Sequence, residues 1–163
     1  MRRVIYIIGG AAVLFGSFLV ALWLTQPSDT QRLAAQRITS YSDLPNLAQN
    51  IGLQRSEQFK GAIYRINRIN EREVNLSGWL ADLEGDSTPL DVLVFINGSV
   101  VAATQTKGER PDVTKFFNFA SGVEQMKNVA FSLNFNCRPG DQPIVVGVGQ
   151  DQQYVPLQSA PCP

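Results

Sequence analysis

The chain has 163 residues, the length of one domain with little room for a second. Lys and Arg together number 14 and so do Asp and Glu, so no basic excess exists to neutralise the phosphates of a nucleic acid. Histidine is absent, which removes the commonest general base, the commonest zinc ligand and every Ser-His or Cys-His pair. Two cysteines are too few for a cysteine-built metal site. The composition therefore argues against a nucleic-acid partner, and we expect no metal or cofactor.

The N-terminus carries a long apolar run. An arginine pair precedes an uncharged stretch from Val4 to Leu24, which as a helix would span roughly 31 Å, about the thickness of a bilayer's hydrocarbon core. The arginines predict that the N-terminus stays in the cytoplasm. A cleaved signal peptide is the alternative, but its apolar core would be only about 7–15 residues long and would end at small residues. We therefore expect residues 1–25 to be an uncleaved single-pass anchor in the plasma (inner) membrane, with an extracytoplasmic domain behind it.

Residues 26–56 are polar and predict a linker or stalk with short helices. One helix is expected after an N-cap at Ser28 or Asp29, and a second from Leu44 to Ile51. The second helix carries an apolar stripe at i, i+3, i+4 and i+7, which we expect to pack on the following domain: Leu44, Leu47, Ala48 and Ile51.

The remaining residues, 57–163, have the pattern of a β domain. Short runs rich in Val, Ile, Phe and Thr are separated by turn signals. The strongest turn signal is Asn97-Gly98, because both central positions of a type I′ hairpin need positive φ. From Val129 to Asn136 apolar and polar residues alternate, which predicts a strand whose inward face carries Val129, Phe131, Leu133 and Phe135.

Seven strands and one short helix follow from these signals. The strands are expected over 59–66, 73–81, 91–96, 99–106, 129–136, 144–148 and 154–157, and the helix over 113–119 with Asp112 as its cap. This count and spacing predict a mainly β fold, an immunoglobulin-like antiparallel β-sandwich over residues 57–163 that folds alone.

The two cysteines lie at the end of one predicted strand and at the penultimate position of the chain. A bond between Cys137 and Cys162 would close a loop of about 25 residues and stabilise the fold by roughly 3 kcal/mol. An oxidising space outside the membrane favours this disulfide over two free thiols.

A family resemblance covers part of the β domain. Its pattern is a Gly-Trp-x-x-Asp strand from Gly78 to Asp82, a strand ending at Asn97-Gly98, an Arg110-Pro111-Asp112 turn, and a late strand Ala130-Phe131-Ser132-Leu133. This pattern resembles a small β-sandwich module of bacterial envelope and polysaccharide-related proteins. The resemblance implies a non-catalytic module of the kind that often accompanies glycosyltransferases or other sugar enzymes, although this chain carries no such enzyme.

Four residues are candidates for ligand contact: Trp79, Asp82, Arg110 and Asp112. For Trp79 we expect a core position, with a packing partner that approaches over the missing side chain of Gly78, rather than an indole that stacks on a sugar. For Arg110 and Asp112 we expect structural roles, with Arg110 in a fork-shaped ion pair to Asp82 or Asp112.

The acidic residues give no clear catalytic or metal site. Asp82, Glu84 and Asp86 alternate along a loop, but an EF-hand would need Gly and Glu where the chain has Ser87 and Leu93. A glycosidase needs two facing carboxylates, and nothing singles out a pair among Asp82, Asp91 and Asp112. We therefore expect no catalytic residue.

The sequence as a whole predicts a binding role. The expected function is a non-enzymatic, membrane-anchored extracytoplasmic module that binds or positions another envelope component, such as a protein. The alternative is a carbohydrate-binding accessory domain for polysaccharide synthesis or modification, which would bind a glycan.

Overall fold

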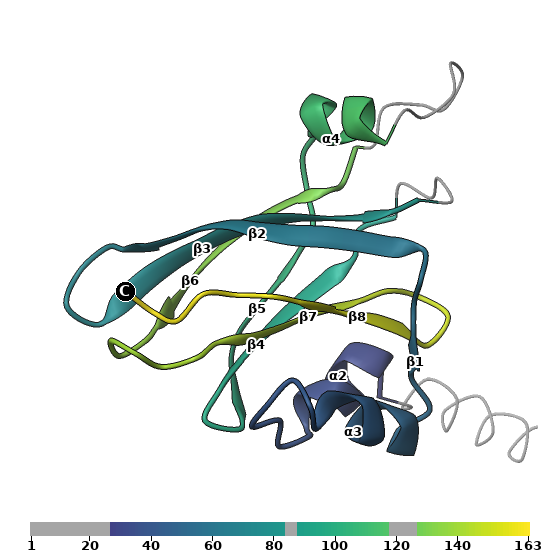
Figure 1. The fold of residues 1–163 in the computed structure, drawn as a ribbon. Coiled ribbons are helices and arrows are strands. Elements are labelled where there is room, and N and C mark those ends of the chain that lie inside the picture. Colours follow the sequence, from purple (N-terminus) through teal and green to yellow (C-terminus); the bar gives the residue numbers. More distant parts are fainter. Residues whose placement is uncertain (1–26, 84–87, 118–126) are drawn as a thin grey trace, which may run out of the picture.

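The computed structural model describes residues 27–83, 88–117 and 127–163, and there the protein forms two β-sheets and three short helices (Figure 1). The larger sheet has five strands in the order β1 (Gln54–Arg55), β8 (Gln153–Leu157), β7 (Ile144–Val148), β4 (Asp91–Ile96) and β5 (Ser99–Gln105). The smaller sheet has three strands in the order β2 (Phe59–Arg68), β3 (Glu73–Asp82) and β6 (Ala130–Asn136). Neighbouring strands are antiparallel except β1 and β8, which are parallel.

The fold class predicted from the sequence needs correction. The described residues form eight strands rather than seven, and the parallel pair at β1 means that the larger sheet is not purely antiparallel. No helix in the described ranges is long and apolar enough to cross a membrane. The anchor expected from Val4 to Leu24 lies outside the described residues. The coarser prediction holds: the protein is mainly β, with two sheets consistent with a β-sandwich.

The predicted hairpin is confirmed. Asn97 and Gly98 have φ values of 52° and 85° and join β4 to β5, as a type I′ turn requires. Strands β4 and β7 begin and end where the sequence predicted. The two-residue strand β1 was missed, since a run that short has no periodicity to detect.

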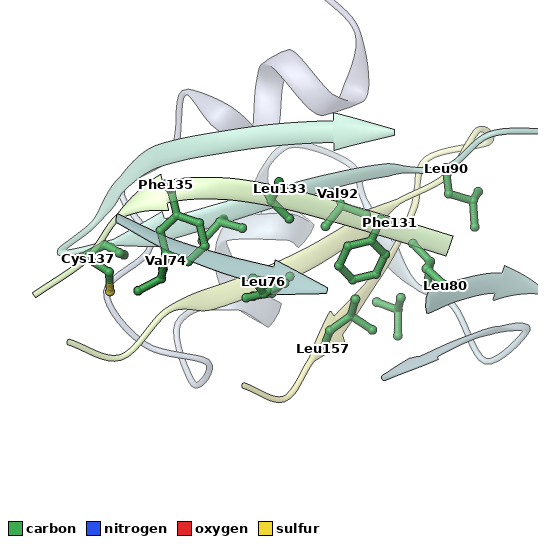
Figure 2. Packing of buried hydrophobic residues seen from close by; sticks show 14 of the residues in the cluster. Val74, Leu76, Leu80, Leu90, Val92, Phe131, Leu133, Phe135, Cys137 and Leu157 are labelled. Atoms are coloured by element: carbon green, nitrogen blue, oxygen red, sulfur yellow. The ribbon is translucent and has the colours of Figure 1, made fainter. Parts of the chain in front are cut away.

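The main core lies between the two sheets, as Figure 2 shows. The inner face of β3 carries Val74, Leu76 and Leu80, which pack with the inner residues of β6. Burying each such side chain stabilises the fold by about 1.5–3 kcal/mol. The β6 residues predicted to face inward are Phe131, Leu133 and Phe135, and all three belong to this core. The prediction was wrong for Val129, which packs with Ala81 in a separate small cluster.

The opposite face of the five-stranded sheet is also apolar and is covered by two helices, α2 (Asp29–Ala34) and α3 (Leu44–Asn50). Figure 1 shows both helices on the side of this sheet away from β2 and β3. The second cluster joins residues of both helices and the connecting segments to the outer faces of β4, β7 and β8: Leu33, Ile38, Leu44, Ala48, Leu53, Leu93, Phe95, Ile144, Val146, Val148 and Tyr154. The predicted apolar stripe of α3 therefore does pack on the domain.

Residues 27–56 thus differ from the expected linker. Their helices and connecting segments form a third layer on the sheet, and residues 54–55 join the sheet itself as β1. The Ser28 cap is confirmed, with its hydroxyl accepting from the Gln31 backbone N–H at 3.2 Å. Between the helices, the Tyr41 hydroxyl donates to the Leu157 carbonyl at 2.6 Å and accepts from the Val145 N–H at 3.1 Å. Burial raises the pKa of Tyr41.

The C-terminal tail is held by the predicted disulfide. Cys137, just after β6, is bonded to Cys162, with their Cα atoms 6.2 Å apart. The tail backbone adds two hydrogen bonds, from the Cys162 N–H to the Asp141 carbonyl at 2.8 Å and from the Gly140 N–H to the Cys162 carbonyl at 3.0 Å. The short tail is therefore ordered by both covalent and hydrogen bonds.

Candidate functional site

The outer face of the three-stranded sheet combines one tryptophan with rows of small and polar residues. Residues directly opposite each other in antiparallel strands place their side chains on the same face. The strand register therefore gives three rows across β2, β3 and β6: Ala62, Trp79 and Ala130; Arg65, Ser77 and Ser132; Asn67, Asn75 and Asn134. We call these nine residues the Trp79 face.

The two polar rows are joined by hydrogen bonds. The Asn75 side-chain amide donates to the Ser132 hydroxyl at 2.9 Å and to the Asn134 carbonyl oxygen at 2.8 Å. The Ser77 hydroxyl donates to the Asn75 carbonyl oxygen at 2.9 Å and lies 3.0 Å from the Ser132 hydroxyl. Both amide hydrogens of Asn75 are used, whereas the amide nitrogen of Asn134 has no partner within the described part of the chain. The network orders these side chains and leaves the two N–H donors of the Asn134 amide available to a ligand.

Trp79 is not the core residue that the sequence predicted. It is only partly buried, and its ring meets the Phe117 ring edge-on with centroids 5.7 Å apart. The aromatic residue that packs over Gly78 is Phe131, on the opposite face, where a Cβ added at Gly78 would lie 2.5 Å from the Phe131 Cζ atom. Side chains alternate across a strand, so Trp79 points away from the core.

A shallow pocket of about 380 Å³ lies between Trp79 and α4 (Pro111–Phe116). Its lining is mostly apolar: Trp79, Asp112, Val113, Phe116 and Phe117. The Phe116 side chain is 80% exposed, an unusual state for so large an apolar group. This pocket extends the Trp79 face with an aromatic edge.

Arg110 and Asp112 form the predicted ion pair at the same end of the face. Two hydrogen bonds of 2.8 and 2.6 Å join the guanidinium to the carboxylate, and this hydrogen bonding lowers the pKa of Asp112 to about 2. The Arg110 guanidinium also lies 4.9 Å from the ring centroid of Tyr64, which is 57% exposed at a bulge in β2. Asp82 is not the partner of this arginine.

The predicted helix cap was wrong. The helix runs over Pro111–Phe116 rather than 113–119, and Arg110 occupies the N-cap position. Asp112 lies inside the first turn, and the side chain of the N-cap residue Arg110 makes no cap hydrogen bond. Proline at the first helical position sets the start two residues earlier than the apolar pattern suggested.

Asp82 belongs to a different site from the other three candidates. It ends β3 and lines a polar pocket of about 440 Å³ together with Gln58, Phe59, Thr88, Leu90, Gln150, Asp151 and Gln153. Its loop neighbours Glu84 and Asp86 lie outside the described residues. Within residues 27–83, 88–117 and 127–163 no three His, Cys, Asp or Glu side chains gather closely enough to hold a metal ion.

The three carboxylates considered for a glycosidase lie in three settings. Asp91 accepts hydrogen bonds from Thr30 and, at 2.9 Å, from the Gln105 amide. Asp112 is bonded to Arg110, whereas Asp82 lines the polar pocket. The structure therefore places these three carboxylates in three different surroundings.

Sequence reasoning missed most of the Trp79 face. The available signal was the alternation of polar residues in two strands, Asn75 and Ser77 in one and Ser132 and Asn134 in the other. Their meeting depends on the β3–β6 register, which local pattern does not specify.

Comparison with known proteins gives no indication of the function of this chain. A scan against protein-family models finds no matching family, and searches of curated proteins and of solved structures find no match. The functional argument therefore rests on the geometry of the Trp79 face.

Proposed function

We propose that this protein is a non-catalytic binding module that holds a glycan on the Trp79 face. The row that places Trp79 between Ala62 and Ala130 carries the proposal. A sugar ring presents a C–H face that packs on an aromatic ring and a rim of hydroxyls that bond to amides and hydroxyls. The two alanines carry little bulk beside the half-buried indole, which also packs against Ala81 and Val129. The polar rows begin immediately beside it.

The dimensions of the face favour a chain of sugars over a single ring. Residues on one face of a strand recur about every 6.7 Å, so the distance along β3 from Trp79 to Asn75 is about 13 Å. Ser77 lies between them and is already ordered by Asn75 and Ser132. Ser77 is buried, so a ligand that stacks on Trp79 would meet the exposed Ser132 and Asn134 that belong to the same network.

Two of the acidic residues support a binding role rather than hydrolysis, because Asp91 and Asp112 are already engaged by other side chains. The disulfide between Cys137 and Cys162 supports an oxidising compartment as the working location of the domain. We propose that location together with the function.

A glycan array probed with the full-length protein tests this proposal. We expect the protein to bind a subset of oligosaccharides, and Trp79→Ala to weaken that binding by about tenfold or more through loss of the aromatic contact. Asn134→Ala should weaken it less. Val101→Ala is the matched control, because Val101 is an exposed apolar residue on β5 of the other sheet. A protein that binds no glycan on the array, or a Trp79→Ala variant that binds as well as the parent, would contradict the proposal.

A second candidate is docking of another envelope protein on the aromatic edge of the face. Trp, Tyr and Arg are the residues most enriched in binding hot spots. Trp79 and the exposed Phe116 line one pocket together with Asp112, and Arg110 bonds to Asp112 and lies over the Tyr64 ring. Phe116→Ala separates the two functions. It should abolish docking of a protein at the pocket but leave glycan binding along the polar rows unchanged.

A further inference from the structure

Two positively charged residues of the edge strand β2 lie at the Trp79 face: Arg65 belongs to it and Lys60 lies beside it. Lys60 pairs in register with Ala81, and Arg65 pairs with Ser77, so both side chains emerge on the same face as Trp79. They lie on the two sides of the row that contains the indole. Both residues are exposed, so their charged ends are available to a ligand that lies on the face.

No described carboxylate neutralises these two cations. The ion pairs in the described ranges join Arg32 to Asp29 and Arg110 to Asp112, and neither Lys60 nor Arg65 takes part. The partners of Lys60 and Arg65 on β3 are uncharged, and β6 carries no charged residue. The carboxylate of Asp112 is already engaged by the guanidinium of Arg110.

The charge is therefore a local asymmetry in a chain whose formal net charge is zero. Glu73, the acidic residue on this face of β3, pairs with Asn136 one row beyond Asn75, at the end of the sheet away from Trp79. Charges of one sign beside an uncharged surface attract ligands of the opposite sign and favour their orientation.

We infer that the glycan held on the Trp79 face is anionic, with acidic groups on its sugars that meet Lys60 and Arg65 while a ring packs on Trp79. This inference rests on the proposed function and names the ligand class of the same site. The planar guanidinium of Arg65 matches a carboxylate, sulfate or phosphate through two parallel hydrogen bonds. Lys60 adds a compact charge on the other side of the indole.

Charged residues on an edge strand can also serve only to prevent sheets of different molecules from pairing. That role needs the charge of Lys60 and Arg65 but no relation to Trp79. The two explanations differ in what the removal of the charges does to ligand binding, and this difference sets the experiment.

The test uses the full-length protein and oligosaccharides of galacturonic and mannuronic acid, each beside its own methyl ester, on the general glycan array described above. We expect an acidic oligosaccharide to bind about tenfold more tightly than its ester at low salt, and the advantage to shrink as salt is added. The double variant Lys60→Gln, Arg65→Gln should bind acid and ester alike. The matched control is Arg72→Gln, Arg138→Gln, which removes two exposed arginines that line a separate groove.

The contrary results distinguish failure of the anionic-ligand inference from failure of the proposed glycan-binding function. One contrary result is that acids and esters bind equally, or that only neutral glycans bind, and that the double variant binds them as tightly as the parent. This result would overturn the inference but would not contradict the glycan-binding function. Absence of binding to every glycan would overturn the proposed function and the inference with it. Polyglutamate that binds as tightly as the acidic oligosaccharides, also to the Trp79→Ala variant, would show attraction by charge alone and overturn the inference.

Discussion

At the scale of single residues, the Gly78-Trp79 pair shows how one strand serves both the core and the proposed binding face. Phe131 fills the space over Gly78 on the inner side, where an added Cβ would also lie 2.6 Å from the Ala62 carbonyl oxygen. Trp79, the next residue, therefore emerges on the outer side. The Gly-Trp pair was visible in the sequence, but the sequence predicted a core position for Trp79 and did not identify the residue that packs over Gly78.

The ion pair of Arg110 and Asp112 could be predicted from the sequence, because the two residues are separated by one proline in a predicted turn. The alternative partner Asp82 was excluded only by the fold, which places Asp82 in another pocket. Short-range contacts of this kind can be predicted, whereas the cross-strand rows of the Trp79 face depend on register.

The same ion pair gives a prediction about titration. The hydrogen bonds from Arg110 hold the pKa of Asp112 at about 2, below its ordinary value of 3.8. Because the folded-state pKa is lowered, the pair favours the fold above the ordinary value and ceases to do so as the pH falls through about 2. The stability effect should be small, since Asp112 is exposed.

NMR titration of the Asp112 carboxyl measures this directly. We expect a midpoint near 2 in the parent protein and a midpoint close to 3.8 in Arg110→Gln. An unchanged midpoint in the variant would mean that Arg110 is not the cause.

At the scale of elements, the clean alternation of β6 identified its inner and outer faces, with burial alternating along the whole strand. Strands β4 and β7 have no such alternation, and their apolar residues are buried on both faces. An uninterrupted apolar run is typical of a strand covered on both sides. That pattern could have predicted a layer over the second face, although not that residues 27–53 would supply it.

The hydroxyl of Tyr41 bonds the segment between α2 and α3 to strands β7 and β8 of the sheet. Its removal gives a second prediction. Tyr41→Phe removes the hydroxyl that bonds to the Leu157 carbonyl and the Val145 N–H, and should lower the free energy of unfolding by about 1–3 kcal/mol. Tyr64→Phe is the control and should change it by less than about 0.5 kcal/mol, because Tyr64 is exposed. Chemical denaturation measures both variants, and equal stabilities would contradict the proposed attachment.

At the scale of the whole molecule, the protein has two clusters of buried apolar residues that share the five-stranded sheet. The first needs only the strands, but the second exists because α2 and α3 cover the sheet. The expected boundary at residue 57 would remove this cover and expose the outer face of β4 and β7. A contiguous apolar patch that covers the face of two neighbouring strands is unusual on the surface of a soluble domain.

Two fragments test the three-layer arrangement. We expect residues 27–163 to unfold cooperatively, and residues 57–163 to be several kcal/mol less stable or to aggregate, because they expose Leu93, Phe95 and Val146. Thermal denaturation followed by circular dichroism compares them. A fragment 57–163 as stable and soluble as 27–163 would show that the two helices and β1 are dispensable.

The central claim is that a glycan packs on the Trp79 indole, and NMR of that indole N–H tests it most directly. The chain has two tryptophans, so Trp79→Phe assigns the Trp79 signal. We expect the Trp79 signal to shift saturably as the glycan that binds best on the array is added, at the concentrations at which that glycan binds. Glycan binding with an unmoved Trp79 signal would contradict the account.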